Sequence, residues 1–205
     1  MISKYTFGGL TWVDLESPTR EEVIHIGQEF NLPNVIGEEI LINTLRSRVD
    51  FYDDFIYIIL HFPTGSGEDL ARSGEKEVDF ILGKKFLITV RYEIIDPLHK
   101  FAKLFEKNSL GSNEKMMNHS GYVFMEMMKQ FYENSIYELE QVNEKLKDIE
   151  DRIFKNQEEL MVKEISKTGR KLLDFKQSIR FHQEILKSYE TSSENFFGQE
   201  YGYYA

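Results

Sequence analysis

The feature that most constrains the fold is an uninterrupted apolar run at residues 55–60, Phe-Ile-Tyr-Ile-Ile-Leu. A strand with one face in water alternates apolar and polar side chains, whereas this run does not alternate. Most of its residues are aromatic or β-branched, which favours a strand over a helix. We therefore predict a central strand at residues 49–61 that is buried on both faces.

Four shorter segments have the composition of further strands. Residues 4–7 and 10–15 are rich in residues that favour strands. Residues 78–82 and 86–90 are separated by Gly-Lys-Lys, which predicts a hairpin. Together with the central strand, these segments predict a mixed sheet.

Helices should flank this sheet. Thr19 and Glu22 have the spacing of a capping box, which predicts that a helix begins there and ends at Asn31 and Pro33. A second short helix is predicted at residues 34–44.

After Asp96 the apolar residues follow helical spacing, and no strand pattern returns. A first helix is predicted around Leu98 and Phe105. Two longer series, at residues 139–153 and 161–189, have the spacing of heptad seams and are joined by a short polar connection. They predict a coiled coil of antiparallel helices.

The expected fold class is α/β (α+β), with a mixed β-sheet flanked by helices and followed by a long antiparallel helical hairpin. We predict an α/β domain at residues 1–112, the hairpin at residues 113–192 and a further segment at residues 193–205.

Charge and composition exclude several function classes. The net charge of −10, from 35 acidic and 25 basic residues, disfavours nucleic acid as a partner, because phosphates require clustered Lys and Arg. The chain has no cysteine, which excludes disulfides, thiolate catalysis and thiolate zinc sites. Its longest apolar run is far below the ~20 residues of a membrane helix, so we expect this chain itself not to span a membrane.

No pattern of catalytic residues is present in the sequence. The histidines are scattered, and no serine lies in a Gly-x-Ser-x-Gly context. We therefore expect no enzymatic activity, and a carboxylate–metal hydrolase ranks last among the alternatives.

Adjacent carboxylates are the remaining chemical signal. Mg²⁺ prefers oxygen ligands and keeps much of its water, so one or two carboxylates can form a weak site with partners from elsewhere. Adjacent acids are also common on solvated helices, and spacing alone favours that interpretation. Four such pairs are Glu21 and Glu22, Glu38 and Glu39, Asp53 and Asp54, and Glu158 and Glu159.

Three segments resemble, in order, the cytoplasmic part of the CorA-type family of magnesium channels. They are Trp-Val-Asp-Leu at 12–15, Arg-Ser-Arg-Val-Asp-Phe-Tyr at 46–52 with the apolar run that follows, and Phe-Leu-Ile-Thr-Val-Arg at 86–91. The resemblance implies a homopentameric ion channel for Mg²⁺ and Co²⁺ in the inner membrane. This chain would be its soluble, cytoplasmic domain and would gate it by sensing cations.

The resemblance also implies a regulatory metal-binding site. In CorA-type proteins an acidic pair in the short helix before an Arg-Pro-Lys-Val-Glu segment helps form cation sites between subunits. Glu38 and Glu39 occupy that place here, with Glu39 where Asp is usual and Ser47 in place of the proline. They are the expected ligands of a regulatory Mg²⁺, with Co²⁺ or Zn²⁺ as alternative ions.

The family's Gly-Met-Asn pore motif and its two C-terminal membrane helices are not found in these 205 residues. We therefore interpret residues 193–205 as the start of a truncated stalk helix. Contact with the membrane is expected only through helices beyond this chain.

Two other functions are compatible with the sequence. One is zinc transport by a relative in the same family. The other is a free-standing cytosolic adaptor that docks a helical protein through its paired helices. Two apolar segments of ~20 residues encoded past residue 205 would indicate the channel, whereas a stop codon there would favour the adaptor.

Overall fold

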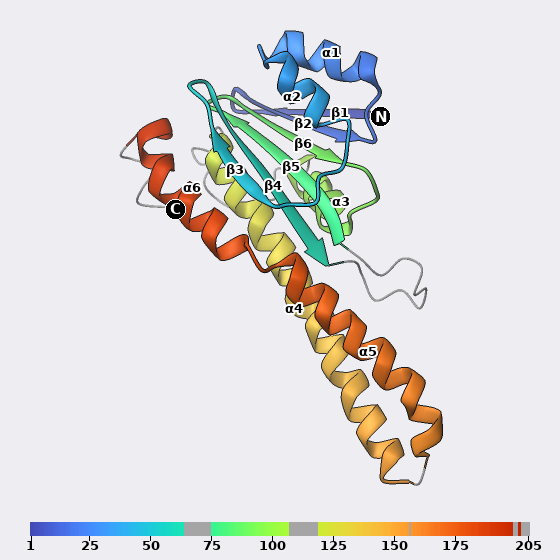
Figure 1. The fold of residues 1–205 in the computed structure, drawn as a ribbon. Helices are drawn as coiled ribbons and strands as arrows, with labels where there is room; N and C mark the ends of the chain where they lie inside the picture. The colour runs from blue at the N-terminus through green and yellow to red at the C-terminus, as the bar shows by residue number, and fades with distance from the viewer. Residues whose placement is uncertain (64–74, 107–118, 156, 199–200, 202–205) are drawn as a thin grey trace.

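The computed structural model describes residues 1–63, 75–106, 119–155, 157–198 and 201, and its centre is a six-stranded sheet (Figure 1). The strand order is β1-β2-β6-β5-β4-β3. Neighbouring strands are antiparallel except β2 and β6, which are parallel, so the sheet is mixed as predicted. The strands are β1 (Ile2–Phe7), β2 (Leu10–Glu16), β3 (Arg48–Phe51), β4 (Phe55–Pro63), β5 (Glu75–Gly83) and β6 (Phe86–Arg91).

Helices cover both faces of the sheet. Helices α1 and α2 lie on one face, and α3 lies on the other with the first half of α4 (Figure 1). The second half of α4 extends away from the sheet and pairs with α5, which confirms the predicted fold class. The helices are α1 (Arg20–Glu29), α2 (Asn34–Glu39), α3 (Asp96–Glu106), α4 (Ser120–Ile153), α5 (Glu158–Ser178) and α6 (His182–Phe197).

The apolar run forms β4, and every residue of this strand except Pro63 is buried. Its side chains alternate between two cores. Ile56 and Ile58 pack with α3, α4 and α6, whereas Tyr57 and Ile59 pack with α1 and α2. Burial of each large apolar side chain contributes about 1.5–3 kcal/mol, so β4 stabilises both layers at once.

The prediction of one central strand at residues 49–61 was wrong in two respects. Residues 48–51 form the separate strand β3, and β4 lies second from the edge of the sheet rather than at its centre. The exposed Asp53 and Asp54 fall between the two strands, because aspartate is unfavourable in strands and common in turns. The charged side chains of β3 suit an edge position.

The capping box of α1 is formed as predicted. The Thr19 hydroxyl accepts from the Glu22 N–H, and the Glu22 carboxylate accepts from the Thr19 N–H. The chain leaves the helix through Asn31, whose φ of 55° is a left-handed conformation that asparagine tolerates.

The second helix is shorter than predicted, because α2 ends at Glu39 rather than near residue 44. The Thr44 N–H donates to the Glu77 carboxylate of β5 (2.5 Å). This N–H is therefore not available for the backbone hydrogen bond that would extend α2. This long-range contact is not visible in the local sequence.

The apolar series at residues 161–189 is divided between two helices. A turn after α5 separates it from α6, and His182 at the start of α6 is buried. Its Nε2 donates to the backbone carbonyl of His61 in β4 (2.8 Å). This anchor directs α6 across the sheet, where Ile185 and Tyr189 join the core.

The predicted domain limits stay predictions. The limit between residues 112 and 113 lies outside the described residues, residue 192 falls within α6, and residues 193–205 are described only at 193–198 and 201. Within the described parts of the chain, no helix combines the length and the apolar character needed to cross a membrane.

Candidate metal centre at the end of α2

Glu38 and Glu39 lie in the last turn of α2 and contact different neighbours. Consecutive helical residues are about 100° apart around the helix axis, so they cannot share one direction. The Glu38 carboxylate accepts two hydrogen bonds from Arg20 of α1 (2.5 and 2.7 Å), whereas Glu39 accepts one from Arg48 of β3. The structure therefore does not bring the two predicted ligands to one point.

Arg48 is shared between two carboxylates. Its Nε donates to Asp50 Oδ2 (2.7 Å), and its guanidinium carbon lies 5.6 Å from the centroid of the Tyr57 ring. Burial alone would lower the pKa of Arg48, but the hydrogen bond to Asp50 and the charge of Glu39 outweigh burial and raise it. One fixed cation thus faces two anions, which leaves a net charge of −1 beside the end of α2.

The ion pair of Glu38 with Arg20 is exposed to solvent. Its side chains are 60% and 64% exposed, so water screens the attraction between them. In the described part of the chain, no group of three or more His, Cys, Asp or Glu residues could hold a metal ion. A cation at Glu38 or Glu39 would need water or groups from elsewhere to complete its shell. The assignment of both residues stays a prediction.

The other acidic pairs lie apart from this region. Glu22 caps α1, and the hydrogen bond from the Thr19 backbone lowers its pKa. Asp53 and Asp54 are exposed between β3 and β4, and Glu159 is exposed at the start of α5. Asp53, Asp54 and Glu159 therefore have the positions of ordinary solvated acids, whereas Glu22 has a capping role.

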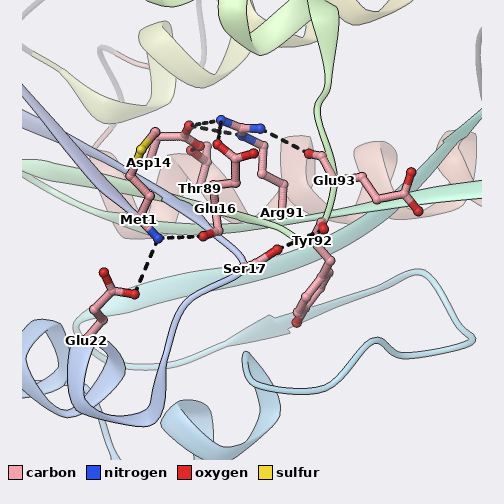
Figure 2. Close-up of polar contacts among 9 residues, drawn as sticks. All are labelled: Met1, Asp14, Glu16, Ser17, Glu22, Thr89, Arg91, Tyr92 and Glu93. Atoms are coloured by element: carbon pink, nitrogen blue, oxygen red, sulfur yellow. Dashed lines mark hydrogen bonds and ion pairs between the residues drawn. The ribbon is translucent and has the colours of Figure 1, made fainter.

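A polar cluster at the ends of β2 and β6 ties the N-terminus to the sheet (Figure 2). Arg91 donates from Nε to Asp14 Oδ2 (3.1 Å) and from Nη2 to Glu16 Oε2 (3.1 Å). The Thr89 hydroxyl donates to Asp14 (2.6 Å) and accepts from the indole of Trp12 (3.1 Å). Because each of these polar groups has a partner, we interpret the cluster as structural.

A third polar cluster is buried between β4 and β5 and was missed by sequence reasoning. Glu77 and Asp79 project from the same face of β5, and His61 and Tyr57 of β4 contact them. One feature of the sequence could have revealed this cluster. Glu77 and Asp79 are two residues apart beside the apolar segment at residues 80–82, and this spacing places both side chains on one face of a buried strand.

Comparisons with known proteins agree with the resemblance found in the sequence. A family model described as "CorA-like Mg2+ transporter protein" matches residues 7–202. The cobalt/magnesium transport protein CorA of Thermotoga maritima is 20% identical over 179 residues, which cover 87% of this chain and 50% of that protein. The chain therefore spans about half the length of this relative.

Solved structures share the fold at low sequence identity. The soluble domain of CorA from Methanocaldococcus jannaschii has a TM-score of 0.76 at 17% identity, over 93% of this chain and 79% of that one. The cytoplasmic domain of ZntB from Vibrio parahaemolyticus has a TM-score of 0.71 at 14% identity, over 91% and 71%. Because the family model covers nearly the whole chain, the protein belongs to the family of CorA-like Mg²⁺ transporter proteins.

Proposed function

We propose that this chain is the regulatory, cation-sensing domain of a CorA-like channel that passes Mg²⁺ and Co²⁺ down their electrochemical gradients. The observation that carries the proposal is the family match over residues 7–202. The name of the Thermotoga maritima relative, a cobalt/magnesium transport protein, supports the choice of ions. The family match favours this function over a free-standing adaptor.

In this proposal the intact protein is a homopentamer, and membrane helices follow this domain in each subunit. The chain corresponds to half the length of its relative, which leaves room for such helices in a full-length polypeptide. The domain would then lie at the cytoplasmic face of the inner membrane. Its contribution is to bias the channel between closed and open states.

Glu38 and Glu39 supply the proposed sensor. Two carboxylates ~5 Å apart across a subunit boundary repel by about 3 kcal/mol at an effective dielectric constant of ~20, and a divalent cation turns that repulsion into attraction. Reversing a 99:1 ratio of closed to open channels needs ~5.5 kcal/mol of differential binding. Five weak sites that each contribute about 1 kcal/mol would supply nearly all of this binding free energy.

Arg20 and Arg48 set the sensitivity of this sensor. Arg20 pairs with Glu38, and Arg48 pairs with Glu39 but is shared with Asp50. A cation must compete with these arginines, which weakens its binding and suits a sensor of millimolar Mg²⁺. Replacing Arg20 with Gln should therefore strengthen Mg²⁺ binding at Glu38.

Zinc transport is the second candidate, and the likeness to the ZntB cytoplasmic domain supports it. Ion flux into liposomes that contain the full-length protein separates the two. Uptake of Mg²⁺ and Co²⁺ that is suppressed by Mg²⁺ on the domain side supports the proposal. Uptake of Zn²⁺ without Mg²⁺ uptake would support the zinc transporter, and no flux of any divalent cation would refute both.

A further inference from the structure

Two carboxylates of β5 are buried without enough hydrogen-bond donors. Glu77 is 5% exposed and Asp79 is 0% exposed. One oxygen of each, Glu77 Oε1 and Asp79 Oδ1, has no partner among the described residues. A buried polar atom without a partner costs free energy comparable to a lost hydrogen bond, so this pair requires a ligand.

The chemistry of the pair identifies this ligand as a proton. The two carboxyl groups project from the same face of β5, two residues apart, and two ionised carboxylates cannot satisfy each other there because both only accept hydrogen bonds. Burial raises the pKa of Asp79 well above its usual value, and the charge of Glu77 raises it further. The Tyr57 hydroxyl donates to the other oxygen of Asp79 (2.7 Å). The bond from Tyr57 opposes this shift, but burial outweighs it and favours the protonated form of Asp79.

A metal ion fits this place less well. Among the described residues no three His, Cys, Asp or Glu side chains converge as a metal shell requires, although His61 lies 3.3 Å from Glu77. A shared proton satisfies both orphaned oxygens without further ligands.

Glu77 holds the chain segment that follows α2. Its Oε2 accepts from the Thr44 N–H (2.5 Å) and hydroxyl (3.1 Å). His61 Nε2 donates to the Thr44 carbonyl (2.9 Å), and His61 Nδ1 lies 2.9 Å from the Ser47 hydroxyl. Burial alone would lower the pKa of His61, but its contacts with Glu77 and Thr44 outweigh burial and raise it. These bonds attach residues 44–47 to the sheet.

We propose that Glu77 and Asp79 form a proton-binding site whose bound proton keeps residues 44–47 attached to β4 and β5. When Asp79 loses this proton, a second negative charge appears beside Glu77 in a buried place. The repulsion displaces the Glu77 carboxylate from Thr44. Loss of the positive charge on His61 as pH rises acts in the same direction.

Other charged and titratable groups face this site from each surrounding element. Arg48 lowers the pKa of Asp79, and Glu75 raises that of His61. Burial raises the pKa of both Tyr57 and Tyr92, so both phenols stay neutral near pH 7. On the opposite side, His182 of α6 contacts the His61 carbonyl and stays neutral at that pH. None of them supplies a fixed positive charge in contact with both carboxylates.

The proposal does not depend on cation transport, because it concerns a property of this chain alone. Only residues 40–43 separate this segment from Glu39, so release of residues 44–47 would loosen the connection that follows α2. Proton binding at β5 would then influence whatever those two acids bind.

Infrared spectroscopy and hydrogen exchange of the 205-residue chain test the proposal. At pH 7 the spectrum should contain the carbonyl stretch of a protonated carboxylic acid, and Asp79→Asn should remove it. Asp54→Asn, a matched loss of one exposed acid between β3 and β4, should leave it in place. As pH rises through the titration of Asp79, amide protection at residues 44–47 should fall about tenfold or more. In Asp79→Asn it should change less.

The infrared measurement needs only the unsubstituted chain, so it decides the question even where a variant folds poorly. Absence of a protonated carboxylic acid at pH 7 would overturn the proposal. So would a protection profile at residues 44–47 that is the same in the unsubstituted chain and in Asp79→Asn at every pH. If the infrared and hydrogen-exchange results are as expected but the full-length protein does not respond to Mg²⁺, the proposed function is contradicted and this inference stands.

Discussion

His182 should make the folded protein sensitive to acid. Its side chain is buried, its Nε2 donates to the His61 carbonyl (2.8 Å), and its Nδ1 accepts from the Tyr132 hydroxyl (2.9 Å). A carbonyl only accepts, so Nε2 carries a proton, and the low pKa of the ring leaves Nδ1 unprotonated near pH 7. Burial lowers the pKa of His182 to about 4.

The sign and size of the effect follow from this pKa. Histidine in an unfolded chain has a pKa of about 6.5, so between pH 6.5 and 4 the unfolded chain binds a proton that the folded chain does not. The free energy of unfolding therefore falls as pH falls through this window. The contribution of His182 is a loss of about 2 kcal/mol at pH 5 and about 3 kcal/mol at pH 4.

Urea unfolding at pH 7, 5 and 4 isolates this contribution. The variant His182→Gln should be less stable than the unsubstituted chain at pH 7, because it loses packing and hydrogen bonds. The difference should shrink by about 2 kcal/mol at pH 5 and about 3 kcal/mol at pH 4, because glutamine does not titrate. His25→Gln, which replaces an exposed histidine, should show a nearly constant difference. A constant difference for His182→Gln as well would refute the reasoning.

Four further substitutions test the packing of the fold by urea unfolding at pH 7. Arg91→Met leaves buried carboxylates without their cation and should cost about 3–5 kcal/mol, whereas Arg48→Met at the edge should cost about 1 kcal/mol or less. Equal costs would contradict this difference in burial. Thr19→Ala removes the N-terminal cap of α1 and should cost about 1 kcal/mol; no loss would show that the cap is dispensable. In Gly121→Ala the new Cβ would lie 2.5 Å from the ring of Tyr201, so a cost of about 1–3 kcal/mol is expected, and an unchanged stability would mean that this ring is not packed there.

Local patterns predicted the elements of the fold well. The apolar run of β4 and the Thr19 capping box each depend on residues close in sequence, and both are confirmed. The prediction failed where a distant partner decides the outcome. The contact of Thr44 with Glu77 shortens α2. The contact of His182 with β4 divides the apolar series at residues 161–189 between two helices.

The candidate sites were less predictable for the same reason. Resemblance to a family placed Glu38 and Glu39 in a short helix, and the structure has them in the last turn of α2. It could not reveal that each carboxylate contacts a different arginine. The pairing of Glu77 with Asp79 depends on burial by other strands and helices, so no local pattern identifies it as a proton site.

The central claim is that Glu38 and Glu39 sense Mg²⁺, and protection of the assembled, full-length protein from protease tests it most directly. Millimolar Mg²⁺ should slow cleavage of the unsubstituted protein. The control Glu150→Gln with Asp151→Asn removes two adjacent, exposed acids far along α4 and should keep this protection. Glu38→Gln with Glu39→Gln should lose most of it. Equal protection by Mg²⁺ in both double variants would contradict the account.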